Sequence, residues 1–419
     1  MRLSPTLSDD ALLDAVQATT LRYFRDFAHP VSGMARERSN QAYDSYSAAD
    51  TVTTGGTGFG VMALVAGTER GIVPRTELVE RLSRILAFLE GADRFRGAFP
   101  HFLHGATGRV IPFSPKDDGA DLVETSFLMM GLLTARQYLA GREPALVAAI
   151  DRLWHGVEWD FFHRAKDDGL LWHWSPNHGF AIDLPITGWN ECLVTHLLAA
   201  ASPGHGVGVG ERPYHRSWAM GNDFRNGESA YGVTLPLGPK LGGPLFFSHY
   251  SFLGLDPRGL VDGYADYFAQ NLAHSRINHA HCVDNPHGHA GYGPACWGLT
   301  ASDDPKGYDA HSPTNDTGTI TPTAALSAFP YLPDEAMAAA RHFGHDRGDD
   351  LFRDLGFADA FHPGAGWVAD SHLAIDQGPI VCMIENHRSG LLWELFMSAP
   401  EVKAGLTLLG FSSPHLTGV

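Results

Sequence analysis

The chain has 419 residues, and with 44% hydrophobic and only 18% charged residues it can bury a large core. Its formal net charge of −17 disfavours nucleic acids and anionic membrane surfaces, because both reward clustered Lys and Arg. The 47 glycines and 26 prolines are dispersed, which indicates long ordered loops and argues against low-complexity disorder.

Residues 1–16 contain no apolar stretch typical of a signal peptide, and no run along the chain approaches the length of a membrane span. We therefore expect either a cytoplasmic protein or a periplasmic or secreted one whose leader has been removed. The cysteines form no CxxC pair and stand in apolar or loop contexts, so we expect free, buried thiols. These residues are Cys192, Cys282, Cys296 and Cys382.

Helical periodicity dominates the chain, in segments that begin at capping residues and end at Gly or Pro. The first helix has an apolar face over residues 12–27, with Ser8 or Asp9 as its cap. The glycine-rich segment 54–60 predicts a tight turn leading into the second helix, and a phosphate-binding loop is disfavoured there. Further helices are predicted over residues 59–66, 78–89, 122–138, 145–159, 191–201, 261–277, 322–329, 333–343 and 380–397.

Short strands are expected only at residues 169–174 and 243–247. About a dozen helices joined by unequal loops, without a repeat of fixed period, predict an all-α fold. A closed ring of helical hairpins, an (α/α)6 toroid formed by one domain over residues 1–419, fits better than a solenoid. The long loops would then surround one mouth, where functional residues gather. These loops span residues 34–56, 95–120, 202–247 and 279–321.

One acidic motif opens the helix predicted at residue 122. Asp117, Asp121 and Glu124 are spaced so that a helix would put them on one face. Asp121 with Glu124 also forms a capping box, so a purely structural role is an equal alternative for Asp121. Asp117 is harder to explain as a cap. The capping role and a role in a site are compatible if the start of this helix lies at the rim of a site.

A second motif is Trp189-Asn190-Glu191, at the start of an apolar helix. A tryptophan beside a glutamate desolvates the carboxyl group and raises its pKa, as a general acid at neutral pH requires. The alternative is an acid that favours the helix dipole next to a core tryptophan. A third acid, Asp376, precedes another apolar helix, and its structural alternative is an N-cap.

The stretch 366–397 places Asp376, Glu385 and Glu394 between tryptophans and apolar runs. A carboxylate in such surroundings must be hydrogen-bonded, paired or shifted in pKa, which is common where acids and bases do chemistry. Acids next to tryptophans recur along the chain, which suggests a carbohydrate-active site.

Two loop segments add polar and aromatic groups. Residues 279–289 contain four histidines, for which hydrogen-bonded loop histidines or sugar-hydroxyl partners are favoured over a metal site. Trp297 to Asp304 predicts an aromatic platform followed by polar groups, as sugar rings require, against the alternative of a structural loop. Four more aromatic residues could add stacking surface: Tyr292, Tyr308, Trp172 and Trp174.

Taken together, the motifs resemble the glucoamylase-like domain family, which includes bacterial endo-β-1,2-glucanases and a domain of cyclic β-1,2-glucan synthases. The matching segments are spread over about residues 20–400, and their combination is specific. They are residues 58–60, 124–136, 189–191, 243–251, 297–303, 321–325 and 375–386.

The resemblance implies an (α/α)6 barrel and an inverting glycoside hydrolase that cleaves linear or cyclic β-1,2-glucan. It places the general acid on Glu191 and the base on Asp376, which acts on water directly or through a substrate hydroxyl. Inversion needs a protonated acid and an ionised base across a gap that holds water, in agreement with these assignments. The substrate-binding residues expected with them are Asp117, Asp121, Glu124, Trp189, Asn190, Trp297, Asp303, Glu385 and His101.

Two segments, residues 206–225 and 279–289, lie outside the motifs that match the family. They could block one end of the cleft or change its substrate preference. A β-1,2-glucan transglycosylase, an exo-acting or remodelling enzyme, and a non-catalytic glycan-binding protein therefore stay open as alternatives. We expect a monomer that acts on a β-glucan oligo- or polysaccharide, without cofactor or metal, and without nucleic acid or membrane as partners.

Overall fold

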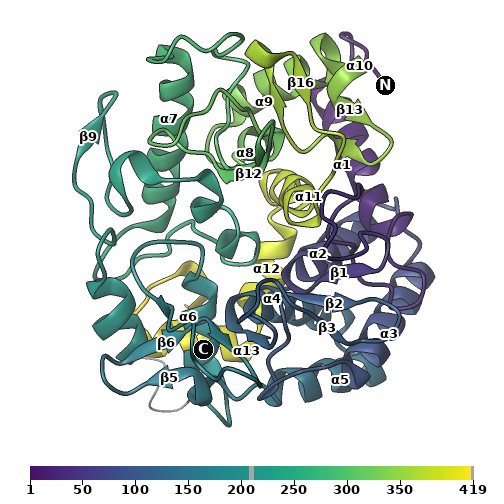
Figure 1. The fold of residues 1–419 in the computed structure, drawn as a ribbon, viewed down its shortest axis with the longest axis vertical. Helices are drawn as coiled ribbons and strands as arrows, with labels where there is room; N and C mark the ends of the chain where they lie inside the picture. The colour runs from purple at the N-terminus through teal and green to yellow at the C-terminus, as the bar shows by residue number, and fades with distance from the viewer. Residues whose placement is uncertain (207–211, 417–419) are drawn as a thin grey trace.

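The computed structural model describes residues 1–206 and 212–416 (Figure 1). Residues 207–211, part of the segment 206–225 considered above, lie outside the described residues. The described helices are α1 (Asp9–Arg25), α2 (Thr54–Glu69), α3 (Arg75–Gly91), α4 (Leu122–Leu139), α5 (Pro144–His155), α6 (Leu193–Ala201), α7 (Tyr267–Asp284), α8 (Pro322–Leu326), α9 (Pro333–Arg341), α10 (Gly348–Leu351), α11 (Ala374–Arg388), α12 (Leu391–Ser398) and α13 (Pro400–Leu408).

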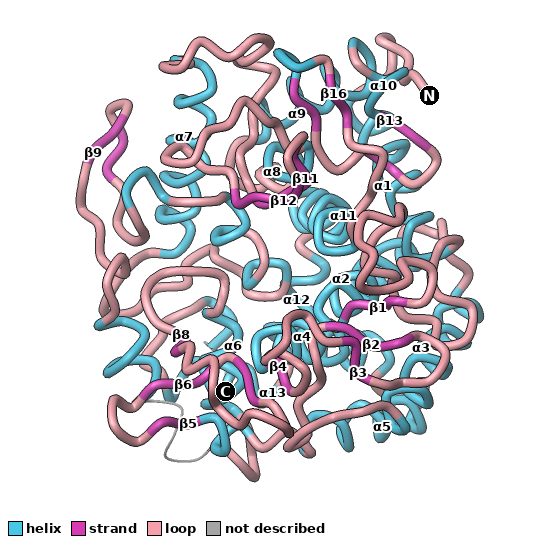
Figure 2. The backbone as a smooth tube through the Cα atoms, in the orientation of Figure 1, coloured by secondary structure: helices cyan, strands magenta, loops and turns pink. Residues whose placement is uncertain are grey.

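The strands are short and lie within the loops that join the helices (Figure 2). All their pairings are antiparallel, and β1-β2-β3 and β5-β6-β8 form three-stranded sheets. The strands are β1 (Thr51–Thr53), β2 (Phe102–His104), β3 (Val110–Ile111), β4 (Ala120–Asp121), β5 (His163–Arg164), β6 (Gly169–Leu171), β7 (His173–Trp174), β8 (Pro185–Ile186), β9 (Ser229–Ala230), β10 (Val233–Thr234), β11 (Ala301–Asp304), β12 (Gly307–Ala310), β13 (Phe352–Arg353), β14 (Gly356–Phe357), β15 (Phe361–His362) and β16 (Trp367–Val368).

The helices form an inner and an outer set. Helices α2, α4 and α11 are buried on nearly every side and lie near the middle of the molecule (Figure 1). Helices α1, α3 and α5 bury one face only, and α1 packs on α11 while α3 packs on α5. A helix that is apolar all round belongs in a core, and an amphipathic one at its edge. The fold is therefore all-α, with one core that runs through most of the chain.

The glycine-rich segment 54–60 is the first part of α2, not a turn before it as predicted. The physical reason is the close packing of α2 on α4. A Cβ atom on Gly58 would lie 2.2 Å from the backbone oxygen of Phe127, and one on Gly131 would lie 2.1 Å from the oxygen of Gly58. Only glycine allows this approach, and burial on all sides outweighs its poor helix propensity.

Most predicted helices are present, and the errors concern their ends. Ser8 caps α1 through a hydrogen bond from the Ala11 N–H, as predicted. The segment 380–397 contains two helices, α11 and α12, separated at Gly390, whose φ of +73° ends the first. Helix α7 extends beyond residue 277, so His279 and His281 are helical, whereas residues 245–248 form a 3₁₀ turn in place of the predicted strand.

All four cysteines are free and buried, as predicted. Within residues 1–206 and 212–416 no helix combines the length and the apolar character that crossing a bilayer requires.

Candidate active site

The first acidic group, which we call the Asp121 group, comprises Asp117, Asp121 and Glu124 with His101 and His173. Asp121 caps α4, because its Oδ1 accepts the Glu124 N–H at 2.9 Å, and the predicted capping role is thus confirmed. Its Oδ2 lies 3.1 Å from Nδ1 of His101, and the β4–β7 pairing places His173 opposite it. Nε2 of His173 lies 3.3 Å from Oδ2 of Asp117. Asp117, Asp121 and His173 could hold a metal ion, since each offers a ligand atom within 4.8 Å of the others.

Burial and mutual charges shift the pKa values within the Asp121 group. Oε2 of Glu124 accepts the Gly55 N–H at 2.7 Å. Burial, and then the charge of Asp121, raises the pKa of Asp117 to about 7. Burial alone would lower the pKa of His101, but the carboxylates of Glu124, Asp121 and Asp117 outweigh it and raise that pKa to about 9. His101 is therefore a cation at neutral pH and offsets part of the negative charge.

Glu191 lies in the turn just before α6 and is 8% exposed. Its backbone oxygen accepts a hydrogen bond from the Ser251 hydroxyl, which fixes the turn. Burial, and then the charges of Glu124 and Asp121, raises the pKa of Glu191 to about 7, so its carboxyl group is electrostatically coupled to the Asp121 group. A carboxyl group with this pKa is largely protonated at slightly acidic pH and can donate a proton.

The second acidic group, which we call the Asp376 group, comprises Asp303, Asp359 and Asp376 with Arg38. Asp376 lies in the first turn of α11 and is 1% exposed. The N-cap of this helix is Leu373, so the capping alternative for Asp376 is wrong. Within the described residues, neither oxygen of Asp376 accepts a hydrogen bond from a donor group, and the Asp359 carboxyl is its polar neighbour.

Two carboxyl groups of the Asp376 group, those of Asp359 and Asp376, both have raised pKa values. Burial, and then the charge of Asp359, raises the pKa of Asp376 well above its usual value. Burial, and then the charge of Asp303, raises the pKa of Asp359 to about 7. Because two carboxylates in contact repel each other, the pair holds at most one negative charge near neutral pH.

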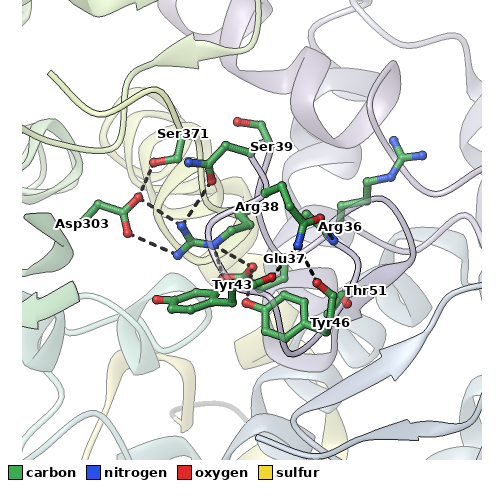
Figure 3. Close-up of polar contacts among 12 residues, drawn as sticks. Arg36, Glu37, Arg38, Ser39, Tyr43, Tyr46, Thr51, Asp303 and Ser371 are labelled. Atoms are coloured by element: carbon green, nitrogen blue, oxygen red, sulfur yellow. Dashed lines mark hydrogen bonds and ion pairs between the residues drawn. The ribbon is translucent and has the colours of Figure 1, made fainter. Parts of the chain in front are cut away.

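Arg38 supplies the cation of the Asp376 group (Figure 3). Its Nη1 and Nη2 each donate to one oxygen of Asp303 at 3.2 Å, and its Nε donates to Glu37 at 3.0 Å. The Ser371 hydroxyl also donates to Asp303. The Asp303 N–H in turn donates to Oδ2 of Asp359 at 2.7 Å, which connects Arg38 to the carboxyl pair.

The Tyr250 hydroxyl interacts electrostatically with members of both acidic groups and with Glu191. Its ring is 7% exposed and stacks on Phe246 with the ring centroids 5.0 Å apart. Burial, and then the charges of Asp376, Tyr308, Glu191 and Glu124, raise the pKa of its hydroxyl well above the usual value. Since Coulomb interactions weaken with distance, the hydroxyl is near both Glu191 and Asp376. The two predicted catalytic acids thus both act electrostatically on one tyrosine hydroxyl.

Tyr308 is the accessible aromatic residue beside Asp376. It lies on β12, opposite Asp303 in the register of the β11–β12 hairpin, and is 47% exposed. The charge of Asp376 contributes to a raised pKa of its hydroxyl, after burial. A cavity of about 380 Å³, lined by residues 304–309 together with Thr317, His362 and Ala365, opens beside it. A ring placed in this way can stack on the C–H face of a sugar.

Burial corrects the predictions for both tryptophans. Trp297 is fully buried and its Nε1–H donates to the backbone oxygen of Glu335 at 3.2 Å. Trp189 is 2% exposed and packs on Trp218 with the ring centroids 5.6 Å apart. Neither ring has a face open to a sugar, whereas Tyr308 is accessible.

Two polar residues predicted to bind substrate are also engaged elsewhere. Oδ1 of Asn190 accepts hydrogen bonds from the Cys192 N–H and from Nε1 of Trp218, at 3.0 and 3.3 Å. Glu385 is 2% exposed and forms an ion pair with Arg70. It lies about 13 Å along α11 from Asp376, because nine residues of helix separate them. The structure therefore does not bring Glu385 to the two acids.

Sequence reasoning missed Asp359, Arg38, Tyr250 and His173. Asp359 stands in the run Phe-Ala-Asp-Ala-Phe, the same signal of an acid among apolar residues that singled out Asp376. The other three carry no such signal, because their partners are distant in the chain. Arg38, for example, meets Asp303 across 265 residues.

Comparison with known proteins gives two family models that match the chain. A model described as "Putative glucoamylase" matches residues 183–400, and a model for a family of unknown function matches residues 16–172. An endo-β-1,2-glucanase from Chitinophaga pinensis, solved with sophorotriose and glucose, is 51% identical, with 98% of this chain and 100% of that chain covered and a TM-score of 0.94.

A second relative is longer than this chain. An exo β-1,2-glucooligosaccharide sophorohydrolase (non-reducing end) from Parabacteroides distasonis is 43% identical over 96% of this chain. The chain spans 58% of the length of that protein. A glucoamylase from Hormoconis resinae is only 10% identical but has a TM-score of 0.57 over 92% of this chain and 74% of that chain, which shows the same type of fold.

Proposed function

The chain belongs to the glucoamylase-like family, and on that premise we propose that it is an inverting glycoside hydrolase acting on β-1,2-linked glucans. The observation that carries this proposal is that two acids with raised pKa values, Glu191 and Asp376, both act electrostatically on the Tyr250 hydroxyl. The substrate class comes from the 51% identical endo-β-1,2-glucanase solved with sophorotriose and glucose, and from the 43% identical sophorohydrolase.

We propose further that the helices form a single (α/α)6 toroid. An inner set buried on all sides and an outer amphipathic set are what such a double ring requires. The fold similarity to a glucoamylase and the single large hydrophobic core support this arrangement and a one-domain chain.

In this proposal Glu191 is the general acid. It transfers its proton to the glycosidic oxygen as the bond from that oxygen to the anomeric carbon breaks. Its pKa of about 7 keeps the proton available in slightly acidic solution, and Glu124 and Asp121 maintain that value through their charges. The Asp121 group would bind sugar hydroxyls beside the acid, with His101 as a cationic donor.

Asp376 is the proposed base. It accepts a proton from water, directly or through a substrate hydroxyl, while the water oxygen bonds to the anomeric carbon from the opposite face. For this step the proton shared by the carboxyl pair must lie on Asp359 or have left it. Since Asp376 is 1% exposed, water and sugar would reach it past Tyr250 and Tyr308.

The experiment that tests the function is a product screen. The protein is incubated with linear β-1,2-glucan, cyclic β-1,2-glucan, and β-1,3-, β-1,4- and α-linked glucans, and new reducing ends are measured. We expect release from β-1,2-glucan alone, with the α-anomer formed first in NMR spectra because inversion of a β-linkage produces it. Prolonged incubation without new reducing ends would instead support a glycan-binding protein.

The same reactions distinguish the remaining alternatives. Exo action releases one short product from the start, whereas endo action gives a mixture of lengths that shortens with time. Adding an acceptor sugar tests transfer, because a transglycosylase would form products longer than its substrate. If longer products formed and few new reducing ends appeared, the activity would be glucan remodelling and not hydrolysis.

A further inference from the structure

A cluster of histidines and one aspartate lies outside the two acidic groups. His281 is in the last turn of α7, His287 and His289 are in the loop that follows, and Asp316 is in the segment between β12 and α8. Nε2 of His281 lies 2.9 Å from Oδ2 of Asp316. One ligand atom each of His281, His287 and Asp316 lies within 4.8 Å of the other two.

The three side chains differ in burial in a way that suits an ion. The side chains of His281 and Asp316 are 2% and 0% exposed, so the pair is removed from solvent. His287 is exposed and has no protein hydrogen-bond partner within the described residues. Nε2 of His289 lies 3.3 Å from Oδ1 of Asp316, and it is buried without a properly aligned hydrogen bond. Three imidazoles, those of His281, His287 and His289, thus lie near one buried carboxylate, and the exposed one of His287 is available for a further ligand.

Neighbouring residues hold the cluster in place. Asn285 ends α7 with a φ of +48°, and its side chain accepts the His289 N–H at 2.7 Å and donates to the His289 oxygen at 2.8 Å. The Tyr231 hydroxyl lies 3.1 Å from Nδ1 of His281, and the Tyr292 hydroxyl donates to Oδ1 of Asp316 at 2.7 Å. Hydrogen bonds of this kind orient the ligands of metal sites. Nε2 of His281 and Oδ2 of Asp316 hydrogen-bond to each other, and the ion would replace that contact.

We infer that His281, His287 and Asp316 form a binding site for a zinc ion, with His289 beside them. Two imidazoles and one carboxylate are typical zinc ligands, and two ligands of a tetrahedral zinc ion lie about 3.3 Å apart at bond lengths of about 2.0–2.1 Å. The 2.9 Å separation of the His281 and Asp316 atoms is close to that value, so small side-chain adjustments admit the ion.

The ion would connect three segments that are otherwise joined by a few hydrogen bonds. Asp316 is followed by Thr317, whose hydroxyl donates to Oδ2 of Asp304 at 3.1 Å. Asp304 ends β11, the strand that carries Asp303 and pairs with the strand of Tyr308. Zinc at this position would therefore stabilise the turn end of the hairpin that carries Asp303 and Tyr308, without taking part in chemistry there.

The test measures zinc binding itself and does not depend on glycosidase activity. Tag-free full-length protein is dialysed against EDTA and titrated with Zn²⁺ by isothermal calorimetry. We expect one ion per chain for the wild type. His287→Gln should weaken zinc binding by at least about 100-fold, and Tyr231→Phe should weaken it by about 10-fold. His279→Gln is the matched control on the same helix, since His279 contacts the Pro294 oxygen and lies outside the cluster.

Two results would overturn the inference. One is a wild-type protein that binds no Zn²⁺, and the other is His287→Gln with wild-type affinity, which would place the ion elsewhere, for example at Asp117, Asp121 and His173. Because His287 is exposed, its replacement leaves the fold intact, and circular dichroism of each variant checks this.

Discussion

The Asp121 group and the Asp376 group each combine three carboxyl groups with one cation, yet they satisfy these acids differently. In the Asp121 group, Asp121 and Glu124 accept backbone N–H groups and His101 adds a positive charge. In the Asp376 group, both Nη atoms of Arg38 donate to Asp303. Within the described residues, Asp376 accepts no hydrogen bond from a donor group. A satisfied carboxylate is fixed in position, whereas an unsatisfied one keeps its lone pairs for a reaction.

The comparison predicts its largest effect at the two acids themselves. Glu191→Gln and Asp376→Asn should each reduce turnover of β-1,2-glucan by about 10²- to 10⁴-fold, because each removes a proton-transfer group. The unfolding temperature of Asp376→Asn should equal or exceed that of the wild type, because the substitution removes a buried carboxyl group that accepts no hydrogen bond from a donor group. Reducing-end assays and calorimetry measure both quantities.

Glu394→Gln is the matched control, because Glu394 lies on the exposed side of α12 with a side-chain exposure of 66%. It should change neither activity nor stability. Full activity in Glu191→Gln or Asp376→Asn would remove that residue from the mechanism.

Arg38 should matter most for stability. Arg38→Met leaves the buried carboxylates of Asp303 and Glu37 without their cation, and removal of one partner of a buried ion pair costs about 3–5 kcal/mol. Urea unfolding of the variant should show this loss. Arg22→Met, which breaks the exposed pair with Asp26, should cost less than about 1 kcal/mol. Equal losses in the two variants would mean that the Asp376 group does not depend on its cation.

The smallest expected effect is a shift in the pH profile of kcat/KM. On the acidic side activity needs an ionised Asp376, and on the alkaline side it needs a protonated Glu191 and falls above about pH 7. After burial, the negative charge of Asp359 raises the pKa of Asp376, so Asp359→Asn should lower that pKa and move the acidic limb to lower pH.

Asp117→Asn separates the two groups in the same experiment. The charge of Asp117 acts on Glu124 and His101 and is not among the charges that raise the pKa of Asp376. The acidic limb of the Asp117→Asn profile should therefore coincide with that of the wild type. An acidic limb that moves in Asp117→Asn and stays in Asp359→Asn would assign the base to the Asp121 group.

The sequence by itself determined the features that depend on neighbours along the chain. Ser8 and Asp121 were predictable as caps, because a cap bonds to a backbone N–H three residues away. The all-α class followed from helical periodicity, and Glu191 and Asp376 could be selected because acids next to apolar helices are under electrostatic strain.

Only the tertiary structure decided which side chains meet and which aromatic rings stay accessible. The sequence predicts Trp297 as the platform for a sugar and Tyr308 only as additional stacking surface, yet the first is fully buried and the second is 47% exposed. Arg38 and Asp359 join the site through contacts with residues far along the chain. Local patterns specify which face of an element is buried, but the partner on that face depends on how the helices pack, and the pKa values depend on those partners.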